Sequence, residues 1–320
     1  AGNHGFGTFS INAAGQWTYS AGAHNEFNAG VDYTDSITVA SVDGTASQVI
    51  TVTITGTNDA ATISGTSTAA LTETNAALSA SGTLAVADLD AGETVFVAQT
   101  DVAGNHGFGT FSINAAGQWT YSAGAHNEFN AGVDYTDSIT VASKDGTASQ
   151  VITVTITGTN DAAKLSSDVV VLDETDAVLT TSGTLTISDV DSAVTFVAQE
   201  VTAGAYGVFT LTADGAWTFT ANSAYDNLVA GREITDTFRV ESVDGTSSYV
   251  EVTIVGTNDA ATISGTSTAA LTESDAPLTA SGTLVVADMD AGETVFVAQT
   301  DAAGNHGFGT FSINAAGQWT

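Results

Sequence analysis

One block of sequence recurs along this chain at a spacing of about 100 residues, and this repetition limits the folds available to it. Residues 1–59 match residues 103–161 at every position but one, and residues 260–320 repeat residues 60–120 with few changes. A block of this length can bury a core of its own, whereas solenoid repeats of about 20–45 residues must stack on their neighbours. We therefore expect a row of separate, similar domains.

The register of the repeats divides the chain into four parts. Residues 60–161 and 162–259 are two complete repeats, residues 1–59 are the C-terminal part of a repeat, and residues 260–320 are the N-terminal part of another. Because the sequence starts and stops inside a repeat, we expect it to be a window from a longer array.

Each repeat ends with the same signal. An alternating apolar run leads into Gly-Thr-Asn-Asp at residues 56–59, and the four residues recur at 158–161 and 256–259. This pattern predicts a strand that leaves one domain and a linker that enters the next. The linkers contain no Pro-rich or Gly/Ser-rich spacer, which favours stiff connections.

Charge is the second constraint. The chain has 36 Asp and Glu residues against 4 Lys and Arg residues, a formal net charge of −32. Such self-repulsion disfavours a compact state and any approach to nucleic acid or to an anionic membrane. A divalent cation would offset the repulsion, and a solvated acidic surface suited to a salt-rich habitat is the alternative. The acids recur at fixed places in the repeat, which favours the cation.

Several other site types are disfavoured by the composition. Cysteine is absent, so disulfides and thiolate metal sites cannot form. No apolar run reaches the ~20 residues of a membrane span. No signal peptide is visible at the first residue, but a sequence that begins inside a repeat gives no information on export.

The local pattern predicts an all-β fold. Thr, Val, Gly and Ser are abundant, short runs alternate between apolar and polar residues, and no helical period persists. In repeat 60–161, strands are expected at residues 61–64, 68–72, 81–87, 94–99, 109–114, 118–122, 138–143 and 149–157. Seven or eight strands at this spacing indicate an antiparallel β-sandwich. The expected core residues are Leu84, Phe111, Ile113, Trp119, Tyr121, Val141 and Ile156.

Calcium requires six to eight oxygen ligands, and each repeat offers oxygens in four places. These are the linker Asn-Asp, a Glu after an early strand, an Asp-x-Asp pair at a strand end, and a later Asp. Strand alternation places both carboxylates of Asp-x-Asp on one side. The candidate ligands are Asn58, Asp59, Glu73, Asp88, Asp90, Asp137, Asn160, Asp161, Glu174, Asp189, Asp191, Asp236, Asn258, Asp259, Glu273, Asp288 and Asp290.

A comparison between repeats separates candidates from other acids. Repeat 162–259 differs widely from its neighbours and still keeps its candidates, but it has no counterpart of Glu93. We therefore left Glu93 out of the predicted site. Asp137 has an alternative role as a strand-end cap. The Asp-Gly pairs at Asp43, Asp145 and Asp244 are interpreted as plain hairpin turns.

No constellation of catalytic residues recurs. The histidines lack the spacing of a zinc site, and no nucleophile recurs with a base and an orienting group. We therefore expect no enzymatic activity. Trp119 and Tyr121 could form a sugar-stacking platform, but aromatic residues that alternate with Thr on a hairpin more often belong to a core.

The sequence resembles the VCBS-type repeats of giant bacterial adhesins, which often accompany calcium-binding RTX segments. The resemblance rests on GTLxVxDxD, GTFSINAAGQWTYS, DSITVASVDGTAS and VITVTITGTND, and it covers the whole sequence. It implies tandem immunoglobulin- or cadherin-like sandwiches, secretion by a type I system, and a place at the bacterial cell surface or in the biofilm matrix.

The resemblance also implies a position for calcium. Cadherin-like repeats bind calcium at domain junctions through a linker Asn-Asp, an early-strand Glu and an Asp-x-Asp of the following domain. In this sequence these are residues 58–59, Glu73, Asp88 and Asp90, with equivalents in later repeats. One departure is that Ala60-Ala61 stand where the cadherin linker carries further acids and a second Asn, which implies fewer calcium ions per junction.

Together these observations predict a calcium-rigidified extracellular stalk or fibre that serves cell adhesion. Its expected partners are the neighbouring repeats of the same chain and lateral homotypic contacts. The alternative is a module that binds surface polysaccharide multivalently.

Overall fold

The computed structural model describes all 320 residues of the chain. The chain divides into two compact units, residues 1–160 and residues 161–320, and each is described by itself. All regular elements are strands, 26 in number. The structure contains no helical segment with the length and hydropathy of a membrane span.

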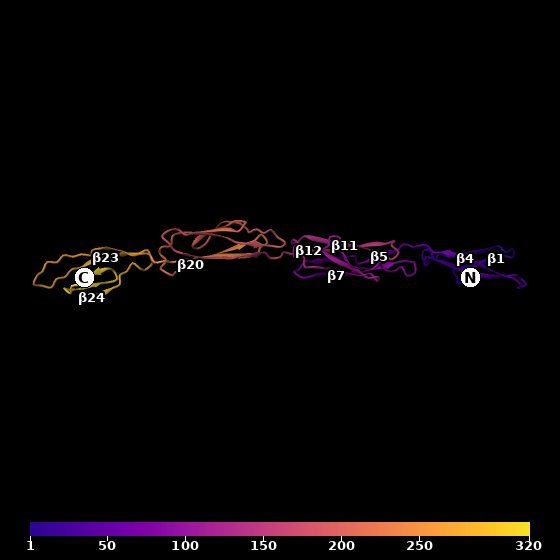
Figure 1. Ribbon diagram of the computed structural model, residues 1–320, viewed down its shortest axis with the longest axis horizontal. Coiled ribbons are helices and arrows are strands. Elements are labelled where there is room, and N and C mark those ends of the chain that lie inside the picture. Colours follow the sequence, from indigo (N-terminus) through magenta and orange to yellow (C-terminus); the bar gives the residue numbers. More distant parts are fainter. The chain divides into compact units, whose positions relative to one another are not determined.

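Residues 60–160 form a complete repeat made of two sheets (Figure 1). The first sheet has the order β5-β7-β10-β9-β8 and the second has the order β11-β12-β6. The strands are β5 (Thr62–Gly65), β6 (Thr68–Thr72), β7 (Leu78–Ala87), β8 (Gln99–Ala103), β9 (Gly109–Ile113), β10 (Gln118–Ala123), β11 (Asp134–Ala142) and β12 (Ser149–Thr157). The predicted all-β sandwich is confirmed.

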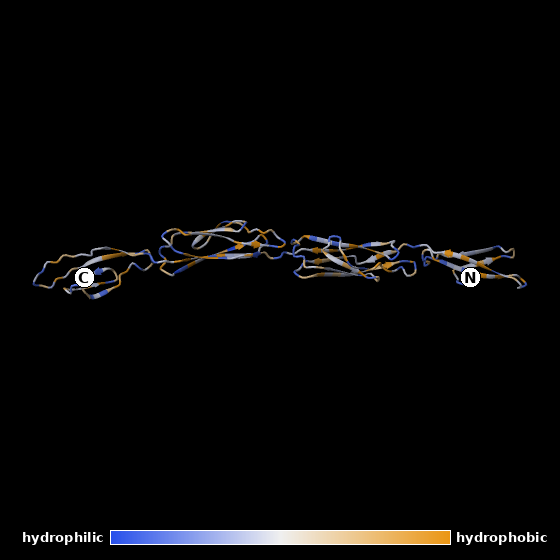
Figure 2. Cartoon of the chain, in the orientation of Figure 1, coloured by the Kyte–Doolittle hydropathy of each residue, from blue (hydrophilic) through white to orange (hydrophobic).

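The core lies between the two sheets because alternate residues of each strand face inward. Along β12, the buried residues are Ile152, Val154 and Ile156, and Thr residues separate them on the outer face. Figure 2 shows the same alternation of apolar and polar residues along the strands. The seven core residues expected from the sequence are all buried, with exposed fractions of 2% or less.

The sequence prediction of purely antiparallel pairing is corrected at one place. β6 pairs with β12 in parallel, with Thr72 opposite Thr157. Parallel neighbours end at the same edge of a sheet, so the residue that follows β6 lies beside the chain as it leaves the repeat. That residue is Glu73, whose backbone N–H donates to the Thr157 carbonyl oxygen (2.8 Å).

A second correction concerns residues 94–99, which do not form the predicted strand. Only Phe96 makes a bridge, to Ser143, and β8 begins at Gln99. The backbone of this segment is held by the end of β11, because the Val97 N–H donates to the Ala142 carbonyl oxygen (3.0 Å). The segment is therefore a loop held against the turn that follows β11.

Residues 1–59 fold into two hairpins. These are β1 (Gly7–Ile11) with β2 (Trp17–Ala21), and β3 (Asp32–Ala40) with β4 (Ser47–Thr55). They are the counterparts of β9 to β12, and residues 1–59 contain no counterpart of β5 to β8. Trp17 is consequently 46% exposed, whereas its counterpart Trp119 is 1% exposed.

The second unit repeats the same design. Residues 161–259 hold a core of twelve buried residues between the sheets β14-β21-β20 and β15-β19-β18-β17. The strands are β13 (Lys164–Leu165), β14 (Asp168–Asp173), β15 (Thr180–Thr184), β16 (Ile187–Ser188), β17 (Gln199–Ala203), β18 (Gly207–Leu211), β19 (Ala216–Ala221), β20 (Glu233–Glu241) and β21 (Ser247–Val255).

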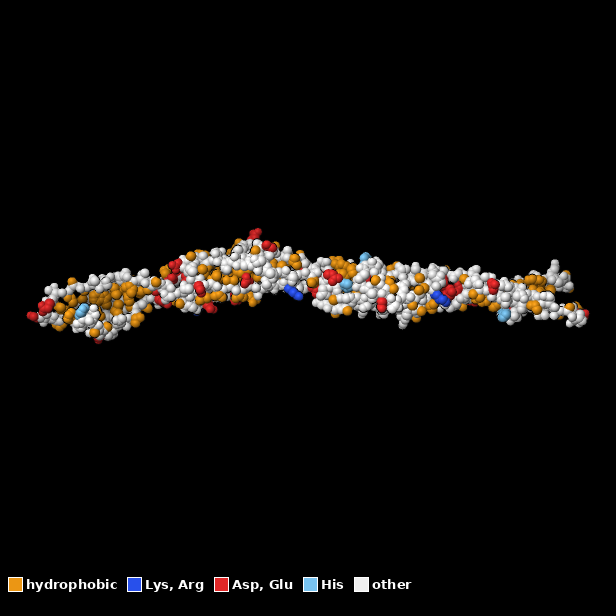
Figure 3. All heavy atoms as spheres, viewed as in Figure 1, with side chains coloured by type: hydrophobic (Ala, Val, Ile, Leu, Met, Phe, Trp, Pro, Cys, Tyr) orange, Lys and Arg blue, Asp and Glu red, His pale blue; other side chains and the backbone are white.

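Residues 260–320 form one five-stranded sheet with the order β22-β23-β26-β25-β24. Its strands are β22 (Thr262–Gly265), β23 (Gly282–Ala287), β24 (Gln299–Ala303), β25 (Thr310–Ile313) and β26 (Gln318–Trp319). Because no second sheet covers it within these residues, Phe311 is 57% exposed. Figure 3 shows the apolar patch on this part of the chain.

Candidate metal centre

The Asp-x-Asp pair of the first unit lies where β7 ends. The Asp90 N–H donates to Asp88 Oδ1 (2.8 Å), which folds the chain into a tight turn. The Asp59 N–H donates to Asp90 Oδ2 (2.8 Å) and so holds the linker against this turn. Asp90 is 2% exposed. The structure therefore brings the linker Asp and the Asp-x-Asp pair together, as the sequence predicted. The placement of Glu73 at this same junction is corrected, because Glu73 contacts Thr159 in the linker that follows its own repeat.

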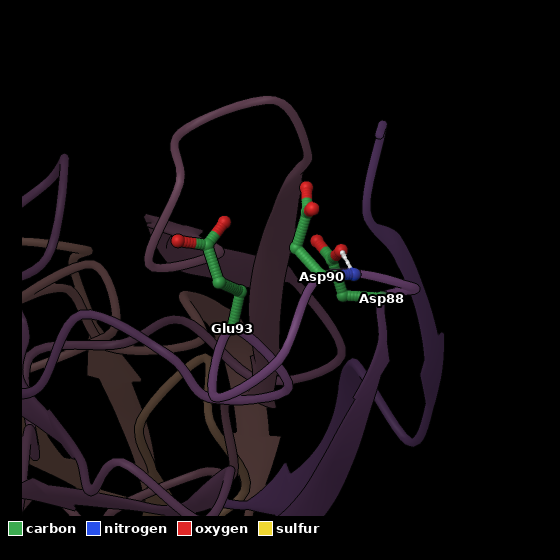
Figure 4. A group of neighbouring side chains, drawn as sticks. All are labelled: Asp88, Asp90 and Glu93. Atoms are coloured by element: carbon green, nitrogen blue, oxygen red, sulfur yellow. Dashed lines mark hydrogen bonds between the residues drawn. The ribbon is translucent and has the colours of Figure 1, made fainter. Parts of the chain in front are cut away.

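Glu93 completes a group of three carboxylates with this pair (Figure 4). One oxygen from each of Asp88, Asp90 and Glu93 lies within 4.8 Å of the others. Asp88 Oδ2, Asp90 Oδ1 and Glu93 Oε2 are buried, and no donor contacts them. A buried carboxylate oxygen without a donor is costly, and a cation would remove that cost. The donor set contains only hard oxygens, which suits calcium.

The second unit contains this group of three carboxylates once, and the Asp-x-Asp turn without a third acid once. In residues 260–320, the ligand atoms of Asp288, Asp290 and Glu293 group within 4.8 Å, and the Asp259 N–H donates to Asp290 Oδ2 (2.9 Å). Asp290 Oδ1 is buried without a donor. At the start of the unit, the Asp161 N–H donates to Asp191 Oδ2 (3.3 Å), and Asp189 Oδ1 accepts the Asp191 N–H (3.0 Å).

The early-strand Glu reaches the linker because of the parallel pairing. β14 pairs in parallel with β21, so Glu174 follows β14 beside the linker that leaves β21. Thr257 Oγ1 donates to Glu174 Oε2 (2.9 Å), while Glu174 Oε1 is buried with no donor. Glu174 itself is 2% exposed, and it groups with Asp176 and Asp259 within 4.8 Å. This glutamate, from the repeat before the junction, therefore lies at the linker Asp.

The electrostatics of this junction are repulsive. The pKa of Asp259 is raised above its ordinary value, first by desolvation and then by the negative charges of Glu174, Asp176, Asp290 and Asp226. No Lys or Arg side chain forms an ion pair with any of these acids. The raised pKa indicates that the gathered carboxylates lack positive charge, which a divalent cation would supply.

The remaining predicted ligands lie as follows. Glu73 is 1% exposed, Thr159 Oγ1 donates to its Oε2, and its Oε1 is buried without a donor. Glu273 is exposed, since residues 268–272 form no strand that would hold it. Asn58, Asn160 and Asn258 are exposed; the side-chain amides of Asn58 and Asn258 donate to the carbonyl oxygens of Asp59 and Asp259.

Asp137 and Asp236 are not brought into any of these groups. Asp137 is fully buried, and its carboxylate accepts the N–H groups of His106 (3.0 Å) and Gly109 (3.0 Å) and the hydroxyl of Tyr121 (3.3 Å). Asp236 accepts three backbone N–H groups of residues 205–207. These carboxylates anchor the loop before β9 or β18, so we leave both residues out of the proposed metal centre.

We expect Asp137→Asn to destabilise residues 60–160 by about 3 kcal/mol, because the amide cannot accept all of these bonds. Calcium should leave this loss unchanged, since Asp137 lies outside the carboxylate groups. Chemical denaturation with calcium and with chelator measures both values. A loss that appeared only in calcium would restore Asp137 as a ligand.

Sequence reasoning missed three kinds of residue at these sites. Glu93 is outside the predicted site because repeat 162–259 lacks a counterpart, and Glu293 is the same position in residues 260–320. Asp176 and Asp226 were not considered, although Asp226 Oδ1 is a buried oxygen without a donor. Their counterparts in residues 60–160 are the amides Asn75 and Asn127, so neither position carries an acid in both complete repeats.

The aromatic pair suggested as a sugar platform is part of the core. Trp119 and Tyr121 are each 1% exposed, so neither ring face is open to a ligand from solvent. These two aromatic residues therefore give no support to the polysaccharide alternative.

The chain was compared with protein families, curated proteins and solved structures. Residues 58–158 and 160–256 each match the sequence profile described as a bacterial cadherin-like domain. The comparison with curated proteins finds no match.

The comparison with solved structures finds cadherin ectodomains at low sequence identity and low TM-score. The protocadherin gammaB7 EC3-6 cis-dimer structure has 13% identity and a TM-score of 0.38, and the match covers 100% of this chain and 80% of that chain. The structure of PcdhgB3 EC1-4 has 14% identity and a TM-score of 0.40, with 78% and 64% covered. Drosophila N-cadherin EC1-4 has 13% identity and a TM-score of 0.27, with 97% and 79% covered.

The two profile matches together span more than half of the sequence. The chain therefore belongs to the family of bacterial cadherin-like domains, which it carries in tandem.

Proposed function

We propose that the junctions between repeats bind calcium, and that the chain is a repeat module of an extracellular adhesive stalk. The observation that carries the calcium proposal is a set of buried carboxylate oxygens without donors. At the junction after Asp259, Glu174 Oε1 comes from the preceding repeat and Asp290 Oδ1 from the following sheet. Both residues are 2% exposed. Asp259 connects the two, because its carboxylate groups with Glu174 and its N–H donates to Asp290 Oδ2. Calcium bound at these groups would therefore link both sides of the junction.

The residues that would hold calcium at this junction are Glu174 and Asp176 on one side, Asp288, Asp290 and Glu293 on the other, and the linker Asp259 between them. Calcium would supply positive charge to these acids and tie the preceding repeat to the following one. A ligand that binds only the folded state stabilises it by RT ln(1 + [L]/Kd), or about 2.7 kcal/mol at 100-fold saturation. Millimolar calcium reaches this value where Kd is about 10 μM, within the range of oxygen-ligand sites.

Membership of the cadherin-like family supports the wider role. Domains of this family are extracellular and of the adhesion type, and calcium binding is general among them. Near-identity between repeats, as between residues 1–59 and 103–161, suits a spacer, in which length matters more than a unique surface. We infer a place at the bacterial cell surface or in a biofilm matrix, reached by type I secretion, and no catalytic role.

The test is a calcium titration of the 320-residue chain. We expect the melting temperature to rise with calcium and scattering to show a narrower range of end-to-end distances than in chelator. Magnesium at the same concentration is the control, because it demands a stricter octahedral geometry and gives up its water reluctantly. Identical melting and scattering in calcium and in chelator would contradict the proposal.

A further inference from the structure

We propose that the turn of residues 143–147 is a clasp that positions the linker and the Asp-x-Asp loop for calcium without binding the ion itself. This inference rests on the proposed calcium function, and it assigns a positioning role to a turn that the sequence indicated only as a hairpin connection. Residues 242–246 form the equivalent turn in the second unit.

The turn holds the linker on both sides of Asp59. Thr147 Oγ1 accepts the Ala61 N–H (2.8 Å), and Asp145 Oδ2 accepts the side-chain amide of Asn58 (3.1 Å). Ala61 is buried, with 8% of its surface exposed. Because Asp59 lies between these two attachment points, its position depends on the turn.

The same turn holds the loop that carries the other carboxylates. The Lys144 N–H donates to the Val95 carbonyl oxygen (2.9 Å), and Lys144 Nζ donates to the Gly92 carbonyl oxygen (3.0 Å). These two carbonyls lie on either side of Glu93 in the sequence. The clasp therefore joins the two segments that supply the carboxylates.

The second unit reaches the same result with different atoms. The Ala163 N–H donates to Asp244 Oδ2 (2.9 Å), where residues 60–160 use a threonine hydroxyl. The Val243 N–H donates to the Thr195 carbonyl oxygen (3.1 Å). Ala163 is 6% exposed. Since the two repeats differ widely in sequence, recurrence of both attachments indicates a shared role for the turn.

The Asp145 carboxylate of the clasp already accepts hydrogen bonds from several donors, whereas the Asp-x-Asp pair has oxygens that accept none. Asp145 accepts from the Ser143 hydroxyl (2.5 Å), from Thr147 and from Asn58. Hydrogen bonds from Ser143 and then Thr147 hold the pKa of Asp145 well below its usual range. Asp90 Oδ1, by contrast, has no donor at all. The clasp is thus complete without a cation.

Thr147→Val in the full chain tests this role. The variant removes the acceptor for the Ala61 N–H, and Thr147 is exposed, so the core is untouched. The matched control is Thr45→Val. Thr45 Oγ1 donates to Asp43 within its turn, as Thr147 does to Asp145, but it accepts no N–H from a linker. Hydrogen exchange by mass spectrometry measures the protection of each junction separately, because the peptides 50–63, 152–165 and 250–263 differ in sequence.

We expect Thr147→Val to raise the calcium concentration for half-protection of segment 50–63 about 5- to 10-fold, as loss of one hydrogen bond would. In chelator, the Ala61 amide should exchange faster in this variant and at the wild-type rate in Thr45→Val. Wild-type calcium protection in Thr147→Val would overturn the clasp, and so would an effect of equal size in the control.

Asp145→Asn separates positioning from ligation. If this variant abolished calcium protection while Thr147→Val left it unchanged, Asp145 would be a ligand and the clasp would be wrong. If the wild-type chain showed no calcium protection, the proposed function would fail instead, and exchange of the Ala61 amide in chelator would still decide whether the turn holds the linker.

Discussion

The double variant Glu174→Gln and Asp290→Asn is expected to abolish calcium binding at the junction after Asp259, with a loss of affinity of at least about 100-fold. The two substitutions replace one buried carboxylate on each side of the junction, and a neutral amide oxygen binds calcium more weakly. Isothermal titration calorimetry of the full chain should show fewer calcium ions bound per chain.

The effect of this double variant on the melting temperature should have opposite signs with calcium and with chelator. In chelator, the acids around Asp259 repel one another, so removal of two charges should leave the melting temperature equal to or above that of the wild type. In calcium, the variant should melt lower because it lacks the bound ion.

The matched control is Asp214→Asn with Glu233→Gln. It removes two negative charges from exposed positions in repeat 162–259, so the net charge changes equally. A control with the same loss of calcium binding would mean that calcium responds to overall charge and not to the junction.

Trp119→Ala should produce the largest loss of stability within a repeat, about 4 kcal/mol for residues 60–160. The ring is 1% exposed, and its Nε1 donates to the Thr66 carbonyl oxygen (2.8 Å). Gly82 lies directly against it, since a Cβ at that position would be 2.6 Å from Trp119 Cζ2. The cavity left by the indole therefore opens between strand β7 and the second sheet.

Chemical denaturation followed by hydrogen exchange of segments from residues 60–160 measures this loss. Trp17→Ala is the control at the same sequence position, because Trp17 is 46% exposed in residues 1–59. Its expected effect on residues 60–160 is none. An equal effect of the two substitutions would contradict the assignment of Trp119 to the core of this repeat.

Much of the fold follows from local patterns in the sequence. Alternation along residues 149–157 places Ile152, Val154 and Ile156 on one face, and the structure buries all three. The pairing of β6 with β12 could not be predicted in the same way. β6 is five residues long and has mostly small side chains, so its alternation does not distinguish a parallel from an antiparallel partner.

The sequence predicted that Asp and Glu residues form the candidate site, but it did not predict which of them lie together. Asp90 and Asp137 both recur in every complete repeat, yet backbone N–H groups saturate only Asp137. That difference depends on the path of a loop far away in sequence. Glu93 was misjudged because the segment between Asp191 and Phe196 is one residue shorter than that between Asp90 and Phe96. A deletion of this kind is not evidence that the longer loop lacks a role.

The clasp gives a physical reason for the second alanine of the linker. Ala61 and Ala163 are buried beneath the turn, where a longer polar side chain would have no space and no partner. The departure from the acidic cadherin linker is thus explained by packing at the second of the two positions.

The parallel pairing of β6 with β12 also determines how a repeat responds to tension. Tension that draws residues 60 and 160 apart would load the pairing of β5 with β7 first. Once β5 gives way, β6 and β12 would be pulled along their own axes in opposite directions. The pairs from Thr68 with Thr153 to Thr72 with Thr157 would then share the load at once. A ladder loaded in this direction must break all its hydrogen bonds together, whereas a hairpin pulled from its open end separates one pair at a time. The strand that brings Glu73 to the junction is thus also the strand that makes the repeat resist extension.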